Sequence, residues 1–176
     1  MIKGQRISIV GTSSSGKSTL GRKLGERLGL PVYDLDDFYW LPGWEVKSPN
    51  QFMVEVEALV AEDSWIIIGN YGTAKLKVWG RADTLVWLDY PLHVCLWRGL
   101  KRVLHRGIIK QKICNGNTES LWRSFFTKES ILLWIVKTYK RRRTENEAAL
   151  SGNPELAKKM IVHRLESISQ AKGLWL

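Results

Sequence analysis

Gly11-Thr-Ser-Ser-Ser-Gly-Lys-Ser18 is the stretch of this sequence that decides the fold, because it fits G-x-x-x-x-G-K-[ST] at every fixed position. The β-branched run Arg6-Ile-Ser-Ile-Val10 precedes it and predicts a buried strand. Leu20, Leu24 and Leu28 follow it at helical spacing and predict a helix over residues 18–28. A strand before and a helix after are the context in which this pattern wraps a phosphate chain.

The chemistry of the loop follows from its residue types. Gly11 and Gly16 allow the backbone to turn its N–H groups inward around an anion, and the helix that follows adds the positive end of its dipole. Lys17 is placed to reach the β- and γ-phosphates, and the Ser18 hydroxyl is placed to bind Mg²⁺. The residues that we predict to bind ATP, or a similar nucleoside triphosphate, are Gly11, Thr12, Ser13, Ser14, Ser15, Gly16, Lys17, Ser18 and Thr19.

Short apolar runs alternate with helical patterns along the whole chain. The predicted strands are residues 6–10, 31–34, 65–68, 84–88 and 160–162. Such alternation predicts an α/β protein, a three-layer P-loop NTPase fold with a five-stranded parallel sheet and helices on both faces. With 176 residues, we expect one domain over 1–176. Trp65, Trp87 and Trp97 lie in apolar runs, and we expect them in the core.

Composition narrows the class. The chain is 44% hydrophobic and 25% charged, which is typical of a globular protein. No apolar run reaches the roughly 18 residues that a membrane span needs. Two cysteines make neither a disulfide framework nor a metal cluster. We therefore expect a cytoplasmic protein with no membrane partner.

The net charge of +10 is concentrated in one segment. Residues 98–143 hold 13 Lys and Arg against two Asp and Glu, whereas the rest of the chain is nearly neutral. Because like charges repel, this segment calls for an anionic partner. It also looks mostly helical and lies between the fourth and fifth strands, where small kinases carry a helical lid. The short length and the lack of a guanine-reading motif also favour a kinase over a motor ATPase or a switch GTPase.

Several motifs together resemble a known family, the adenylate kinase-like nucleotide kinases, and most closely the group called topology modulation proteins. The resemblance covers nearly the whole chain. Its marks are residues 11–31, Asp34-Leu-Asp-Asp37 with Phe38-Tyr-Trp40, Gly69-Asn-Tyr71, residues 81–91, and Asn115-Gly-Asn-x-Glu-Ser120. It implies an enzyme that transfers the γ-phosphoryl of ATP, with Mg²⁺, to a nucleotide, a nucleoside or another small acceptor.

The resemblance also implies roles for two arginines. In adenylate kinases an R-x-x-x-R pair follows the Asp-x-Pro that ends the fourth strand, and the same count from Asp89-Tyr-Pro91 leads to Arg98 and Arg102. By this similarity Arg98 lies against the adenine and Arg102 contacts the phosphates. Residues four apart share one face of a helix, so both can point into one cleft. The alternative is a solvated basic helix face.

Acidic residues follow the second strand, at the edge of the sheet where open parallel sheets bind ligands. Related small kinases use Asp-x-Asp here, so we assign Asp34 to the metal and Asp36 to the acceptor, with Asp37 as a further candidate. The alternative is an acidic helix N-terminus. The other predicted acceptor-binding residues are Trp44, Gly69 and Asn70.

One position departs from the family pattern. The family has an acidic residue immediately before Gly-Asn-Tyr, and this chain has Ile68. Either Asp34 and Asp89 supply the missing charge, or catalysis is weakened.

The sharpest charge run is Arg141-Arg-Arg143. In a lid it would close over the polyphosphate, and we predict that Arg123 and one of the three, with Arg141 and Arg142 as candidates, make that contact. A solvated or nucleic-acid-facing surface is the competing interpretation. The alternative function is therefore a nucleic-acid-binding, ATP-dependent regulator of DNA topology.

Overall fold

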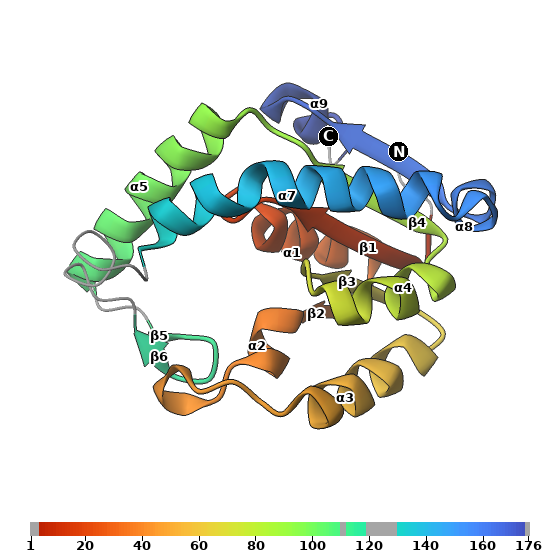
Figure 1. The fold of residues 1–176 in the computed structure, drawn as a ribbon, viewed down its shortest axis with the longest axis horizontal. Helices are drawn as coiled ribbons and strands as arrows, with labels where there is room; N and C mark the ends of the chain where they lie inside the picture. The colour runs from red at the N-terminus through yellow and green to blue at the C-terminus, as the bar shows by residue number, and fades with distance from the viewer. Residues whose placement is uncertain (1–3, 110–111, 119–129, 175–176) are drawn as a thin grey trace.

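The five predicted strands form one parallel sheet in the order β2-β3-β1-β4-β7 (Figure 1). The computed structural model describes residues 4–109, 112–118 and 130–174. The strands are β1 (Arg6–Gly11), β2 (Val32–Asp34), β3 (Trp65–Ile68), β4 (Thr84–Leu88) and β7 (Ile161–Leu165). The last strand begins one residue later and ends three residues later than its sequence predicts.

Side chains that alternate along the central strands build two separate cores. On β3, Ile66 and Ile68 face one core, whereas Trp65 and Ile67 face the other. The first core lies under α1 (Lys17–Leu28), α9 (Ile168–Lys172) and the start of α5 (Leu92–Ile109). The second lies under α3 (Pro49–Ala61), α4 (Gly72–Arg81) and α8 (Pro154–Lys159). The predicted three layers are therefore confirmed.

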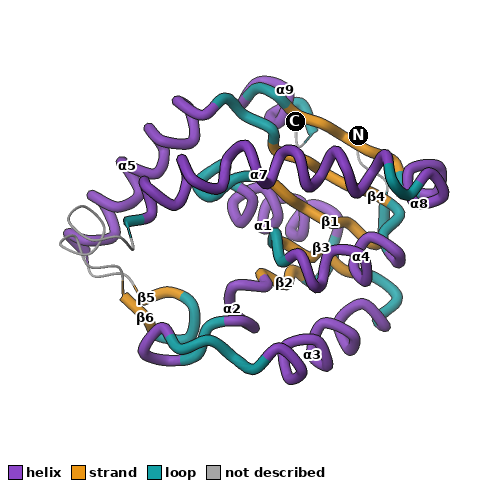
Figure 2. Tube along the Cα trace, in the orientation of Figure 1, coloured by secondary structure: helices purple, strands orange, loops and turns teal. Residues whose placement is uncertain are grey.

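The long insertion between β4 and β7 extends beyond the sheet (Figures 1 and 2). It contains α5, the small antiparallel hairpin of β5 (Lys112–Ile113) and β6 (Asn117–Thr118), and α7 (Ile131–Ser151). We expected this segment to be mostly helical, and the hairpin is a difference. Its cause is local, since Cys114, Asn115 and Gly116 have φ values of 40°, 62° and 87°, which no right-handed helix can contain.

The prediction for the tryptophans is correct for two of three. Trp65 and Trp87 are buried, but Trp97 is 59% exposed and lies under the amine of Lys101 at 4.9 Å. The phase of α5 explains the error, because Cys95 and Val103 occupy its buried face. Among the described residues, no helix combines the length and the apolar character that crossing a bilayer requires.

Candidate phosphoryl-transfer site

The glycine-rich loop between β1 and α1 closes tightly on itself. Gly11 and Gly16 have φ values of 149° and 98°, and a Cβ on Gly11 would lie 2.6 Å from the Leu88 carbonyl oxygen. The Ser15 N–H donates to the Thr12 carbonyl at 3.1 Å. The Ser14 and Ser15 hydroxyls are buried and make no hydrogen bond within the described residues. Buried polar groups of this kind suit a polyanion that accepts from them.

Asn70, at the end of β3, clamps the start of the loop. Its side-chain oxygen accepts from the Gly11 N–H at 3.1 Å, and its amide donates to the Gly11 carbonyl. We predicted an acceptor contact for Asn70, but its amide is engaged with the loop. Gly69, beside it, has a φ of 153°, and a Cβ there would lie 2.9 Å from that of Leu35. Asn70 therefore shapes the contact between the loop and β3, and Gly69 allows the close approach of Leu35 at the start of α2.

Lys17 follows Gly16 at the start of α1 and is half-buried. Its Nζ donates to the Thr12 carbonyl at 3.2 Å. Burial, and after it the charge of Arg142, lowers the pKa of Lys17 to about 8, while Asp36 and Asp34 oppose the shift. Arg102 of α5 also lowers this pKa, which brings the predicted phosphate arginine into the surroundings of Lys17. Two cations held near a buried amine form a site in which a polyanion is favoured.

Ser18 and Asp34 lie together. The Ser18 hydroxyl donates to Asp34 Oδ2 at 2.6 Å, and the Asp36 N–H donates to Asp34 Oδ1 at 3.3 Å. Asp34 therefore also caps α2 (Leu35–Tyr39), so the capping alternative and the predicted metal position coincide. A hydroxyl and a carboxylate are the oxygen donors that Mg²⁺ uses when phosphates and waters complete its shell. The described residues hold no cluster of three or more His, Cys, Asp or Glu side chains fit for a metal.

Asp36 is oriented by a residue that the sequence did not assign. The Tyr71 hydroxyl donates to Asp36 Oδ1 at 2.6 Å. Burial, followed by the charge of Asp36, raises the pKa of Tyr71, so the phenol stays a donor. Burial and then Asp36 raise the pKa of Asp37. Tyr71 follows Gly69-Asn70 directly, and a polar ring placed just after a strand end was the signal that could have identified it.

Only one residue of the predicted arginine triple contacts the loop in the described structure. Arg142 Nη1 donates to Ser13 Oγ at 3.2 Å, and its guanidinium lies 5.6 Å from the Trp134 ring. Arg141 pairs with Glu145 at 3.6 Å on the outer side of α7. Arg143 pairs with Asp89 at 3.5 Å and with Glu147 at 3.6 Å. The predicted contact of Arg123 lies outside the described residues.

Arg98 contacts the back of the loop. Its Nη1 donates to the Ser15 carbonyl at 2.6 Å, and its guanidinium lies 5.6 Å from the Tyr90 ring. The guanidinium borders a shallow pocket of mostly apolar character, whose lining includes Thr19, Leu20, Tyr90, Arg98, Ile168 and Ala171. The adenine contact of Arg98 stays a prediction, and this pocket is where the base would lie under it.

Ile68, at the position where the resemblance led us to expect an acidic residue, is part of the hydrophobic core. Ile68 is buried, and its Cδ1 lies 2.4 Å from where a Cβ on Gly21 would stand, so it fills the contact between β3 and α1. Asp89 is committed elsewhere, because Arg164 donates to its Oδ2 at 2.5 and 2.8 Å. Of the two predicted substitutes, Asp34 is therefore the one beside Ser18.

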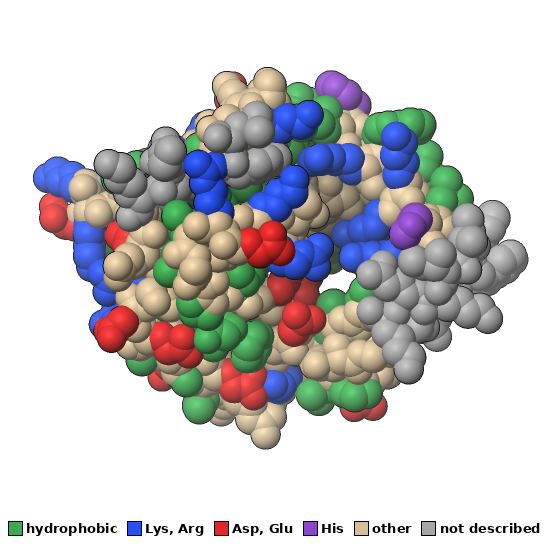
Figure 3. All heavy atoms as spheres, turned by 180° about the vertical axis from the view of Figure 1, so that it is seen from behind, with side chains coloured by type: hydrophobic (Ala, Val, Ile, Leu, Met, Phe, Trp, Pro, Cys, Tyr) green, Lys and Arg blue, Asp and Glu red, His purple; other side chains and the backbone are tan. Residues whose placement is uncertain are grey.

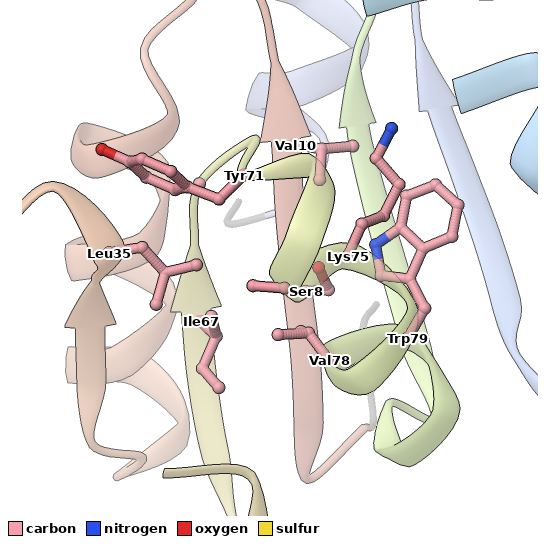
Figure 4. A pocket seen from close by; sticks show the side chains of 10 residues that line it. Ser8, Val10, Leu35, Ile67, Tyr71, Lys75, Val78 and Trp79 are labelled. Carbon is pink, nitrogen blue, oxygen red and sulfur yellow. The ribbon is translucent and has the colours of Figure 1, made fainter. Parts of the chain in front are cut away.

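A cavity lies between α4 and the sheet (Figure 4). Its lining is mostly apolar, with Leu35, Ile67 and Val78 among the residues, so it belongs to the packing of α4. Figure 4 shows Tyr71 and the amino end of Lys75 toward the carboxyl end of the strands. Burial lowers the pKa of Lys75, with Glu145 opposing and Arg142 adding to the shift. Lys75 thus adds a cation at the edge of the site.

The hairpin is fastened to the segment that carries the acidic residues. Asn117 Oδ1 accepts from the Trp44 N–H at 3.0 Å, and Asn117 Nδ2 donates to the carbonyls of Leu41 and Cys114 at 2.9 and 2.7 Å. Asn115 Nδ2 donates to the carbonyls of Asp37 and Trp40, both at 2.7 Å. In the sequence these two asparagines stand out only as one of the marks of the family resemblance. Their side chains join the insertion to α2 and to the 3₁₀ turn η1 (Pro42–Trp44), which holds the predicted acceptor residue Trp44.

Replacing Asn117 with alanine is expected to destabilise the fold by about 2 kcal/mol, because the buried Asn117 amide satisfies one N–H and two carbonyls that would lose their partner. Chemical denaturation followed by tryptophan fluorescence measures the change. Asn115→Ala is the control, since Asn115 is exposed and water can replace its bonds; we expect a loss below about 1 kcal/mol. Equal, small losses in both variants would show that the hairpin is not fastened there.

A parallel sheet in the order β2-β3-β1-β4-β7, with G-x-x-x-x-G-K-S between its central strand and the next helix, defines a P-loop NTPase fold. Solved structures agree. The chain is similar to shikimate kinase from Aquifex aeolicus vf5, with a TM-score of 0.55 and 19% identity over 96% of this chain and 92% of that one. It is also similar to shikimate kinase from Acinetobacter baumannii in complex with shikimate, with a TM-score of 0.53 and 18% identity over 97% of this chain and 88% of that one. For a gluconokinase from Sinorhizobium meliloti 1021 the TM-score is 0.50 and the identity 14%, over 95% of this chain and 89% of that one.

The chain therefore has the P-loop fold of small-molecule kinases. Sequence comparison adds little to this. No protein-family model matches the chain. The uncharacterized protein YqaC of Bacillus subtilis (strain 168) is 32% identical over 108 residues. That match covers 58% of this chain and 56% of the relative, so the chain spans just over half the length of the curated protein that it matches.

Proposed function

We propose that this protein transfers the γ-phosphoryl group of ATP to a small-molecule acceptor. One observation carries the proposal. The carboxylate of Asp36, oriented by Tyr71, interacts electrostatically with both Lys17 and Arg142 at the phosphate loop. A base that faces two phosphate-binding cations is what a phosphotransferase needs between its donor and its acceptor.

The reaction then follows from the positions of these groups. The acceptor oxygen bonds to the γ-phosphorus while the bond from that phosphorus to the β–γ bridging oxygen breaks, and ADP leaves. Asp36 takes the proton of the acceptor. Lys17 and Arg142 stabilise the charge on the transferring group, and Arg98 stands by the pocket for the base. When bound by Ser18 and Asp34, Mg²⁺ would neutralise charge on the β- and γ-phosphate oxygens.

The insertion acts as a lid within a single domain under this proposal. α5 and α7 bring Arg98, Arg102 and Arg142 to the loop, and the hairpin connects the insertion to the acceptor side. Closing both sides around the reacting groups excludes water, which limits wasteful hydrolysis of ATP.

The affinity for ATP is expected to fall as the pH rises above about 8. In the free protein the pKa of Lys17 is about 8, and a bound triphosphate raises it. Below pH 8 Lys17 is charged with or without ATP, whereas above it each binding event must take up a proton, so affinity drops by up to about tenfold per pH unit. Calorimetry at pH 8 in buffers of different ionisation enthalpy should find uptake of about half a proton.

Lys17→Arg is the control for this pH dependence, because a guanidinium does not titrate in this range. An affinity of the original protein that stays constant from pH 7 to 9 would contradict the lowered pKa of Lys17.

The proposed function is tested by incubating the purified protein with Mg²⁺ and ATP and with a panel of nucleotides, nucleosides, polyols and sugars. Release of ADP is followed, and the phosphorylated product is identified by mass. We expect acceptor-dependent release well above the rate in acceptor-free blanks. A protein that binds ATP but phosphorylates no member of the panel would refute the proposal.

The finer assignment to the topology modulation protein group stays a prediction. The alternative function is binding of nucleic acid through the basic segment. The positions of Arg141, Arg142 and Arg143 support it less well than they support phosphoryl transfer. Arg142 is engaged at the phosphate loop and Arg143 at Asp89, which leaves Arg141 on the outer side. A phosphate-backbone surface needs such cations turned outward together.

A further inference from the structure

The two sides of the site differ sharply in charge. The segment from β2 to α3, residues 32–62, holds seven Asp and Glu and one Lys, and we call it the acceptor wall. The acidic residues of the wall that lie at the site are Asp34, Asp36 and Asp37, whereas Glu57 is paired with Lys77 at 2.7 Å. Its Lys47 is bound by both carboxylate oxygens of Glu55, at 2.6 and 2.7 Å. The wall therefore offers no cation that is not already paired with a carboxylate.

The cations that contact the phosphate loop belong to the opposite side, and Lys75 of α4 lies at the edge of the site between the charges of Glu145 and Arg142. Lys17, Arg98 and Arg142 each donate to an atom of the phosphate loop, and Arg102 lies near Lys17. Figure 3 shows a hollow with Lys and Arg side chains along its upper side and Asp and Glu side chains along its lower side. The triphosphate of ATP requires the cations, so they are not left over for a second anion.

The pKa of Cys114, in the turn of the hairpin, also reflects the negative charge of the acceptor wall. Burial, and then the charges of Asp36, Asp37 and Asp34, raise the pKa of the Cys114 thiol to about 12. Arg106 lowers the pKa of this thiol by less than any of these effects raises it. For the Cys114 thiol, where the hairpin meets the wall, the charges of the three carboxylates therefore outweigh that of Arg106.

The wall also carries aromatic rings, and their cluster extends beyond the wall to Tyr71, which follows β3. Tyr39, Trp40, Trp44, Phe52 and Tyr71 make a continuous cluster with centroid distances of 4.6 to 5.5 Å. Trp40 and Trp44 are half-buried and lie edge to face. The face of an aromatic ring carries negative charge density, so it attracts C–H groups, flat rings and cations and disfavours anions.

Resting on the proposed function, we propose that the acceptor is a neutral or positively charged hydroxyl compound, such as a polyol, a sugar, a nucleoside or an amino sugar. Its phosphorylated and carboxylated analogues are excluded by the acidic acceptor wall. Discrimination of this kind arises from repulsion of the wrong partner as much as from attraction of the right one.

The test compares matched pairs with the full chain, Mg²⁺ and ATP. The pairs are glucose and gluconate, adenosine and its 5′-monophosphate, and methyl shikimate and shikimate, with glucosamine as the cationic member. The readout is kcat/KM from ADP release, with product identified by mass. We expect the uncharged or cationic member of a productive pair to exceed its anionic partner about tenfold or more, and the ratio to shrink at high salt.

A charge variant checks that the wall is the cause. Asp37→Lys is expected to raise the kcat/KM ratio of anionic to neutral acceptor at least about tenfold, and Asp37→Asn to raise it by a smaller factor in the same direction. The two variants are read together, so that poor folding of the lysine variant does not remove the test.

The outcomes separate this inference from the proposed function. Equal or preferred transfer to the anionic members overturns the inference and leaves the kinase proposal standing. A protein that binds ATP yet transfers to no compound of either class refutes the kinase proposal, and the inference falls with it. Transfer to the neutral members with an unchanged ratio in both Asp37 variants also overturns the role of the wall.

Discussion

Arg142→Ala is expected to lower the rate of phosphoryl transfer about a thousandfold, the scale on which a charge-stabilising arginine acts in such reactions. The side chain reaches the phosphate loop from α7, and its Nη1 lies 3.2 Å from Ser13 Oγ. Charge that spreads over the transferring phosphoryl oxygens would lose one of its partners. Single-turnover kinetics measure the loss in the rate of the chemical step. Steady-state kinetics give kcat and the KM for ATP.

Arg141→Ala is the matched control, one residue away and identical in chemistry. Arg141 is exposed and pairs with Glu145, so the expected loss is less than about threefold. A loss of similar size in both variants would mean that the arginine triple acts only as a diffuse positive field. A full rate in Arg142→Ala would remove Arg142 from the mechanism.

Asp36→Asn is expected to lower kcat for acceptor phosphorylation about 10²- to 10⁴-fold, the usual worth of a positioned general base. The amide keeps the shape of the carboxylate but cannot take the proton of the acceptor. ATP affinity, measured by calorimetry, should change by much less, because Asp36 makes no direct contact with the loop that the described structure records.

Asp37→Asn serves as the neighbour control, since Tyr71 orients Asp36 and not Asp37. We expect its kcat for a neutral acceptor to fall less than about tenfold. The kcat of Tyr71→Phe should lie between those of Asp36→Asn and Asp37→Asn, because this variant keeps the Asp36 carboxylate but removes its hydrogen-bond partner. An unchanged rate in Asp36→Asn would assign the proton transfer to another group and contradict the proposed mechanism.

Much of the fold could be predicted because its signals are local. The glycine spacing of residues 11–18 is fixed by how a backbone wraps phosphate, and the leucines of α1 repeat with the helical turn. The five strands follow from short apolar runs, and burial on both faces makes such runs distinctive. These features depend on neighbours along the chain, so a sequence displays them directly.

The candidate site could be predicted only in part. Lys17, Ser18, Asp34 and Asp36 follow from motifs that stand next to strand ends, and the described structure brings them together. The position of Tyr71 just after a strand end could mark it as a candidate, but not as the partner of Asp36, because their hydrogen bond joins segments 35 residues apart in the sequence. Trp97 shows the same limit for packing, since its burial depends on what the other helices leave uncovered.

The sequence by itself determined the phosphate loop, the alternation of strands and helices, and the presence of one strongly basic segment, because each is written in residue types at short spacing. Only the tertiary structure decided which arginine of residues 141–143 turns to the loop, that Asp89 serves Arg164, and that the hairpin is fastened to the acceptor wall. Those outcomes depend on the phase of α7 and on contacts between segments more than 70 residues apart, which residue type alone cannot encode.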